Sequence, residues 1–78
     1  MRRLPVYQLI DCSGSMIGGP IEDVKVGLQT MTSALRTDPY ALETVHLSVI
    51  TFSQQAHQSV PLTELVQFQV PDIQASGT

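Results

Sequence analysis

The chain has 78 residues, which allows one domain at most, and a chain this short buries a smaller share of its surface than a typical domain. Hydrophobic residues make up 42% of it and charged residues 14%, a balance that excludes an intrinsically disordered chain. With a net charge of −3 and only four lysine and arginine residues, it lacks the basic surface that binding to nucleic acid or to an anionic membrane requires.

The N-terminal segment superficially resembles a secretion signal, because two arginines precede an apolar run. Gln8 and Asp11 interrupt this run before a signal core can form. No segment reaches the roughly 18 apolar residues that a membrane-spanning helix requires. The single cysteine, Cys12, cannot form an internal disulfide, which is typical of a reducing compartment. These features predict a cytoplasmic protein.

The first predicted element is a strand at Val6–Ile10. This mostly apolar run follows Pro5 and precedes the small residues of Ser13–Ser15. A short apolar run of this kind is typical of a strand that is buried on both faces. We therefore expect a central strand of a parallel sheet.

The second predicted element is a helix over Pro20–Arg36. Proline suits the first position of a helix, and Glu22 and Asp23 complement the positive charge of the helix start. Asp38-Pro39 is expected to stop the helix. Apolar residues recur at steps of three and four and predict one buried face, formed by Ile21, Val24, Leu28, Met31 and Leu35.

Two further strands are predicted in the second half of the chain. Thr44–Phe52 is rich in β-branched and aromatic residues, and a shorter strand over Ala56–Leu62 contains Pro61, which favours an edge position. Thr63 is expected to cap a single turn that runs through Leu65, and the tail over 67–78 is assigned no regular element. Strand, helix and strand together predict a parallel crossover unit of an open α/β sheet.

The segment Asp11–Ser15 contains the side chains that are best suited to bind a ligand. Asp11, Ser13 and Ser15 alternate with small residues, so three short oxygen-bearing side chains can converge on one point. An oxygen-only set suits Mg²⁺, Mn²⁺ or Ca²⁺ rather than zinc. The segment follows the first strand, where open α/β sheets bind ligands. Because a single carboxylate does not neutralise a divalent cation, the bound ion would favour a further acidic group as a ligand, which a partner can supply.

Three other interpretations of this segment can be compared with metal binding. Asp11 could merely cap the following turn of a structural module that binds no metal. Asp11 could also be the nucleophile of a haloacid-dehalogenase-like phosphohydrolase, although the position of the second aspartate holds Ser13. Cys12 fits a buried small hydrophobe better than a phosphatase nucleophile, because Gly18 stands where an arginine would be needed.

Leu9–Met16, followed by Gly19–Ile21, resembles the opening of the metal-ion-dependent adhesion site of von Willebrand factor A domains. Over nearly the whole chain, the segments Met1–Tyr7, Asp38–Glu43 and Pro61–Thr63 resemble the tellurite-resistance TerY branch of that family. The resemblance implies a doubly wound, Rossmann-like sheet, of which this chain would supply β-α-β-β. It also implies that Asp11, Ser13 and Ser15 hold the ion and that Thr78 joins them from a later loop.

The resemblance carries further expectations. Residues 1–78 would form the N-terminal part of a single, truncated domain that lacks the acidic ligand of the third family motif, so Mg²⁺ would bind weakly in this fragment. The function implied is a non-enzymatic protein-interaction module of a tellurite-resistance or stress-response system, with kinase or phosphatase components as partners. Because the family sheet places a parallel strand beside Val6–Ile10, that strand is expected to keep an unpaired edge here, through which the chain can self-associate.

Overall fold

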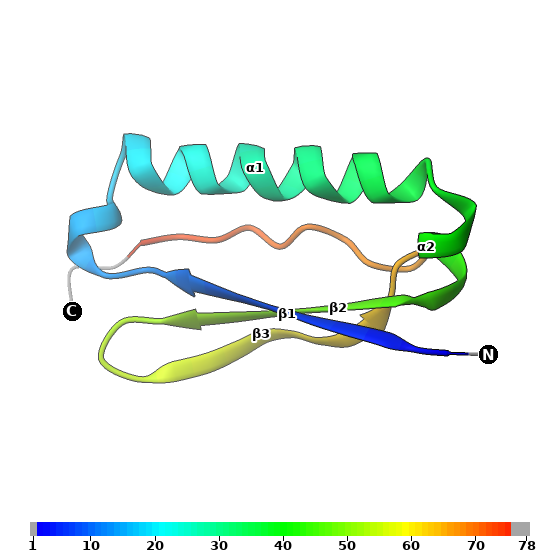
Figure 1. The fold of residues 1–78 in the computed structure, drawn as a ribbon. Helices are drawn as coiled ribbons and strands as arrows, with labels where there is room; N and C mark the ends of the chain where they lie inside the picture. The colour runs from blue at the N-terminus through cyan, green and yellow to red at the C-terminus, as the bar shows by residue number, and fades with distance from the viewer. Residues whose placement is uncertain (1, 76–78) are drawn as a thin grey trace.

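The computed structural model describes residues 2–75, which form an α/β fold with one mixed three-stranded sheet (Figure 1). The fold class predicted from the sequence is confirmed. In chain order the elements are β1 (Leu4–Asp11), the short 3-10 helix η1 (Gly14–Met16), α1 (Gly19–Arg36), α2 (Pro39–Thr44), β2 (Val45–Phe52) and β3 (Ala56–Glu64). In the described part of the chain, no helix is long and apolar enough to cross a membrane.

The sheet has the order β1-β2-β3. β1 and β2 are parallel, and their register places Leu4 opposite Val45 and Asp11 opposite Phe52. β2 and β3 are antiparallel, with register shifts at Val49. The predicted strand-helix-strand crossover and the edge position of the third strand are therefore confirmed. The central strand among the described residues is β2.

The first strand has the unpaired edge that was expected in this chain, but among the described residues it is not buried on both faces. β1 lies at an edge, and only the face that bears Val6, Gln8 and Ile10 is covered. On its other face Tyr7 is 56% exposed and Leu9 is 70% exposed. The reason is that α1 covers one side of the sheet and no described element covers β1 on the other. The Cα extents of 42 × 22 × 14 Å fit such a thin two-layer arrangement.

α1 packs the predicted apolar face onto the sheet. Ile21 and Leu28 are buried, and the other three predicted residues are half-buried. Thr32 joins them unexpectedly, because its hydroxyl donates a hydrogen bond to the carbonyl of Leu28 at 2.7 Å and so leaves no unpaired donor inside. The buried core as a whole consists of Ile10, Cys12, Ile21, Leu28, Ala41, Val45, Leu47, Val49, Leu65, Phe68 and Ile73.

Two local predictions need correction. Asp38-Pro39 follows α1, as predicted, but it also begins a second helix. The Asp38 carboxylate accepts a hydrogen bond from the N–H of Tyr40 at 3.0 Å and so caps α2. Thr63 caps no turn, since it lies within β3 and pairs with Leu47 of β2. The turn instead follows the end of β3, over residues 65–67, and the N–H of Gln67 closes it by donating to the carbonyl of Glu64 at 2.9 Å.

The segment over residues 68–75 has no regular element, as predicted, yet it is part of the core. Phe68 and Ile73 are almost fully buried. The Arg36 guanidinium donates to the carbonyls of Leu65 and Phe68, and Lys25 forms an ion pair with Asp72 at 3.2 Å. Figure 1 shows this segment running alongside α1. Burial and these contacts hold it there without strand pairing.

Gln8 provides a test of polar burial in the core. Its Nε2 donates to the sulfur of Met31 at 3.4 Å, while its Oε1 is buried without a hydrogen-bond partner among the described residues. An unpaired buried acceptor costs roughly 1–3 kcal/mol. Gln8→Leu should therefore raise the free energy of unfolding by about 1 kcal/mol in urea denaturation. The control is Gln54→Leu, in an exposed loop, which should leave it nearly unchanged. A destabilised Gln8→Leu would show that this oxygen is satisfied.

Candidate metal centre

The segment Asp11–Ser15 lies where the two parallel strands end. β1 ends at Asp11, and the N–H of Cys12 still donates to the carbonyl of Phe52, the last residue of β2, at 2.7 Å. The chain then turns through η1 and enters α1 at Gly19. The carboxyl ends of parallel strands are the usual ligand-binding edge of an α/β sheet. The sheet therefore brings this loop to a position suited to a ligand.

Short contacts link the three predicted metal ligands within this loop. An Asp11 carboxylate oxygen, Oδ1, accepts the N–H of Ser13 at 2.8 Å. The hydroxyl oxygens of Ser13 and Ser15 lie 3.0 Å apart. The N–H of Met16 closes the turn by donating to the carbonyl of Ser13 at 2.9 Å. Asp11 and Ser13 are half-buried and Ser15 is exposed, so the loop is open to solvent.

The electrostatics of the loop favour an ionised aspartate beside a neutral thiol. Hydrogen bonds from Ser13, first from its backbone N–H and then from its hydroxyl, lower the pKa of Asp11. Burial, and then the negative charge of Asp11, raise the pKa of the Cys12 thiol. Cys12 is buried in the core, which confirms its interpretation as a small packing residue. Asp11 therefore supplies an ionised carboxylate to this loop at neutral pH.

The chemistry of this oxygen set fits a hard divalent cation. One carboxylate and two hydroxyls suit Mg²⁺, which commonly keeps several waters and takes only one or two carboxylates from the protein. Among the described residues, no group of three or more histidine, cysteine or acidic side chains is placed to hold a metal ion. The predicted fourth ligand, Thr78, lies outside the described residues.

The turn-cap hypothesis for Asp11 also fits part of this geometry. The bond from the N–H of Ser13 to the Asp11 carboxylate is the one that an aspartate at the start of a turn makes. A turn cap gives no reason, however, for the hydroxyls of Ser13 and Ser15 to meet. The two hypotheses differ in one measurable respect, because only one of them requires a cation at the loop.

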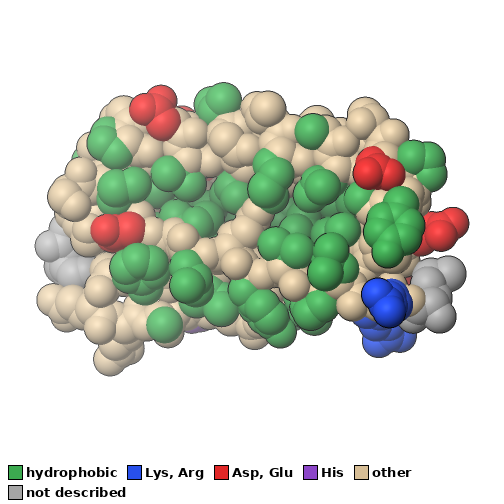
Figure 2. Space-filling view, in the orientation of Figure 1, with side chains coloured by type: hydrophobic (Ala, Val, Ile, Leu, Met, Phe, Trp, Pro, Cys, Tyr) green, Lys and Arg blue, Asp and Glu red, His purple; other side chains and the backbone are tan. Residues whose placement is uncertain are grey.

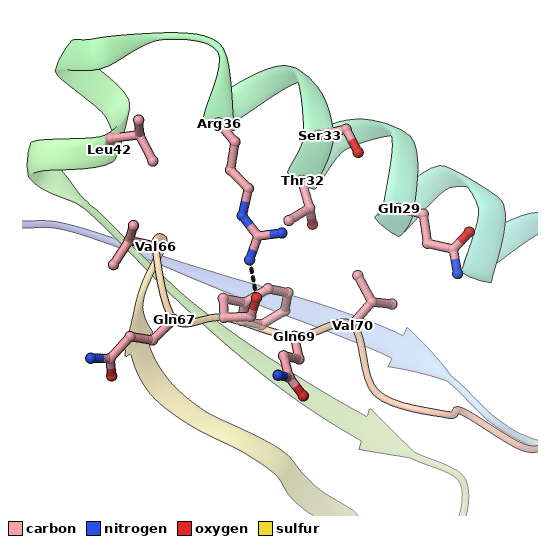
Figure 3. A pocket seen from close by; sticks show the side chains of 10 residues that line it. Gln29, Thr32, Ser33, Arg36, Leu42, Val66, Gln67, Gln69 and Val70 are labelled. Carbon is pink, nitrogen blue, oxygen red and sulfur yellow. Dashed lines mark hydrogen bonds between the residues drawn. The ribbon is translucent and has the colours of Figure 1, made fainter.

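Two cavities lie away from this loop. One, of about 890 Å³, opens between the C-terminal half of α1, α2 and residues 66–70, and Arg36 lies on its wall (Figure 3). A second, of about 410 Å³, is lined by residues such as Arg3, His46 and Glu64 at the end of the sheet where β1 begins. Asp11, Ser13 and Ser15 line neither. The candidate metal centre is therefore separate from both of these cavities.

Arg36 is the side chain whose role the sequence did not reveal. Its position in the last turn of α1 indicated only a helix end, whereas the structure shows it binding two backbone carbonyls of the segment that follows β3. Figure 3 shows the guanidinium directed from α1 toward that segment. Because the acceptors are main-chain atoms, no pattern of residue types could have indicated them.

Comparison with known proteins gives one match. The sequence model of the family described as von Willebrand factor type A domain matches residues 6–75. The match therefore includes β1 from Val6 onward, the Asp11–Ser15 loop, η1, α1, α2, β2 and β3. No curated protein and no solved structure matches the chain.

Proposed function

Because the chain belongs to the von Willebrand factor type A domain family, we propose that its Asp11–Ser15 loop binds Mg²⁺ and, through it, an acidic group of a protein partner. Domains of this family are commonly metal-dependent protein-interaction modules. The observation that carries the proposal is the meeting of Asp11, Ser13 and Ser15 in one solvent-open loop at the carboxyl ends of β1 and β2. With one carboxylate bound, the cation keeps positive charge for a partner's acidic side chain.

The same observations favour an interaction module over an enzyme. Family members are typically not enzymes, and a haloacid-dehalogenase-like reaction would need a proton-transferring group two residues after Asp11. That position holds Ser13, whose hydroxyl lies beside that of Ser15 and whose pKa range makes it a poor acid or base. A phosphohydrolase assay with a generic aryl phosphate should therefore give no turnover above buffer.

Finer parts of the proposal rest on the sequence resemblance. We place the chain in the tellurite-resistance TerY branch, acting in the cytoplasm within a stress-response system whose partners include kinase or phosphatase components. We also propose that residues 1–78 form the N-terminal part of a larger domain, with Thr78 as a further ligand. The exposed side chains of Tyr7 and Leu9 support the proposal of a larger domain, since a doubly wound sheet has helices on both faces.

Paramagnetic Mn²⁺ in place of Mg²⁺ gives a direct test on this chain. Substoichiometric Mn²⁺ should broaden the amide NMR signals of residues 11–16 selectively, because relaxation falls off steeply with distance from the ion. Excess Mg²⁺ should restore them by competition. The internal control is the exposed acidic pair of Glu22 and Asp72 around Lys25, whose amides should stay sharp. Broadening there, with residues 11–16 unaffected, would place the cation elsewhere and contradict the proposal.

A further inference from the structure

Arg36 and Lys25 hold the segment that follows β3 at two points along α1. The Arg36 guanidinium donates to the carbonyls of Leu65 and Phe68, and its Nε and one terminal nitrogen lie 3.3 and 3.2 Å from the Leu65 oxygen. Lys25, about three turns earlier in α1, forms an ion pair with Asp72 at 3.2 Å. The segment therefore runs from the C-terminal end of α1 toward its N-terminal end.

The segment has little slack between these two contacts. From Lys25 to Arg36, α1 rises about 16 Å. The chain from Phe68 to Asp72 can span at most about 14 Å, and the two long cationic side chains make up the difference. Residues 68–72 must therefore be nearly extended, as Figure 1 shows. A chain without slack passes a displacement at one end on to the other.

Side-chain burial keeps the segment against the core without fixing its position along α1. Phe68 is 1% exposed, Ile73 is 3% exposed, and Val70 packs against the same core. Figure 2 shows apolar side chains gathered between α1 and the sheet, where the segment lies. Among the described residues, no backbone hydrogen bond joins residues 69–75 to the sheet or to α1. Apolar contacts are non-directional, so the directional bonds of Arg36 set the position of the segment.

The segment leads to the end of the sheet that carries the candidate metal centre. In the chain, α1 follows the Asp11–Ser15 loop and η1, so the N-terminal end of α1 adjoins this loop. Met16 of η1 and Ala75 of the segment pack against the same core. Thr78, the proposed further ligand, follows Ala75 by three residues in the sequence.

We propose that Arg36 is a positioning residue of the metal centre. By holding the carbonyls of Leu65 and Phe68, it sets where the segment ends and so presents Thr78 to the ion at the Asp11–Ser15 loop. This inference rests on the proposed function, because it needs a bound ion with Thr78 among its ligands. Arginine suits the role, since its planar guanidinium stays charged and carries its donors in a fixed fork.

The first test is a titration of Mg²⁺ followed by the amide NMR signals of residues 11–16, which also measures weak binding. Arg36→Gln should raise the Mg²⁺ dissociation constant about tenfold, although every proposed ligand is still present. Arg2→Gln removes the same charge from an exposed position before β1 and should stay within about twofold of wild type.

A third variant separates positioning from a general loss of stability. Val60→Ala truncates a half-buried side chain of β3 that packs against the core, so it should lower the urea midpoint. Its Mg²⁺ affinity should nevertheless stay near that of wild type. Equal affinities for wild type and Arg36→Gln, or an equal loss in Val60→Ala, would overturn the inference. A wild type that binds no Mg²⁺ would refute the proposed function, and the inference with it.

The second test needs no variant, so it holds even if Arg36→Gln fails to fold. Coupling between two sites is reciprocal, so an ion that is strengthened by the Arg36 contacts must strengthen those contacts in return. The carbonyl ¹³C signals of Leu65 and Phe68 should therefore shift during the Mg²⁺ titration, with the same midpoint as residues 11–16. The control is the carbonyl of Val60, which accepts the Ser48 hydroxyl at 2.8 Å and should not shift. Unchanged signals at residues 65 and 68 while residues 11–16 saturate would overturn the inference.

Discussion

Leu28→Ala is expected to lower the free energy of unfolding by about 2–5 kcal/mol. Leu28 lies in the middle of α1 and is only 7% exposed, packed in the core with Ile21 and Val49. The truncation removes apolar contacts and leaves a cavity that the sheet cannot close. Because a domain of this size has a small core, such a loss is a large fraction of its total stability.

Thermal and urea unfolding, followed by circular dichroism, measure this effect. The matched control is Val26→Ala on the opposite face of α1, where the side chain is 60% exposed and the expected change is within about 0.5 kcal/mol. An unchanged midpoint for Leu28→Ala, or an equal loss for both variants, would show that the buried face of α1 is misassigned.

The elements that the sequence predicted well are those whose signals are local and repeated. α1 begins one residue before the predicted start and ends at the predicted Arg36, because apolar spacing and Pro20 define it over eighteen residues. β2 likewise begins one residue from its expected start. α2 was missed because six residues are too few to show a helical period. Its start signal, Asp38 before a proline, was interpreted only as the end of the preceding helix.

Features that depend on distant segments escaped prediction. An apolar run such as β1 predicts burial on both faces, yet exposure depends on whether another element covers the sheet, and Leu9 stays 70% exposed. Phe68 and Ile73 are buried without any regular spacing. The Asp11–Ser15 loop was easier to foresee, because its contacts join residues two positions apart. The metal it is proposed to hold stays a prediction.

Asp11→Ala is expected to abolish Mg²⁺ binding, because Asp11 is the only anionic group in the loop. Ser13→Ala and Ser15→Ala should weaken binding without abolishing it, since each removes a neutral ligand. The fold should survive, because Asp11 is half-buried and its carboxylate accepts local hydrogen bonds from Ser13, two residues away. Circular dichroism and the urea midpoint check that each variant is folded.

The pH dependence follows from the same residue. Because Ser13 lowers the pKa of Asp11, its carboxylate stays ionised above its ordinary pKa and for some distance below it. Mg²⁺ affinity should therefore hold as the pH falls from neutral and be lost only as the pH passes through the lowered pKa. The hydrogen bonds from Ser13 also stabilise the fold with the same pH dependence. Their contribution is fully present above the pKa that Asp11 has in the unfolded chain, and it is lost as the pH falls through the lower pKa of Asp11 in the folded chain.

Isothermal titration of Mg²⁺ into wild type, Asp11→Ala and Asp23→Ala tests the metal-site proposal most directly. Asp23→Ala removes an equal charge from an exposed position in the first turns of α1, so it controls for the change in net charge. The proposal predicts weak, saturable binding to wild type and to Asp23→Ala, and none to Asp11→Ala. Equal Mg²⁺ affinity for wild type and Asp11→Ala would contradict it and leave Asp11 as the cap of a turn.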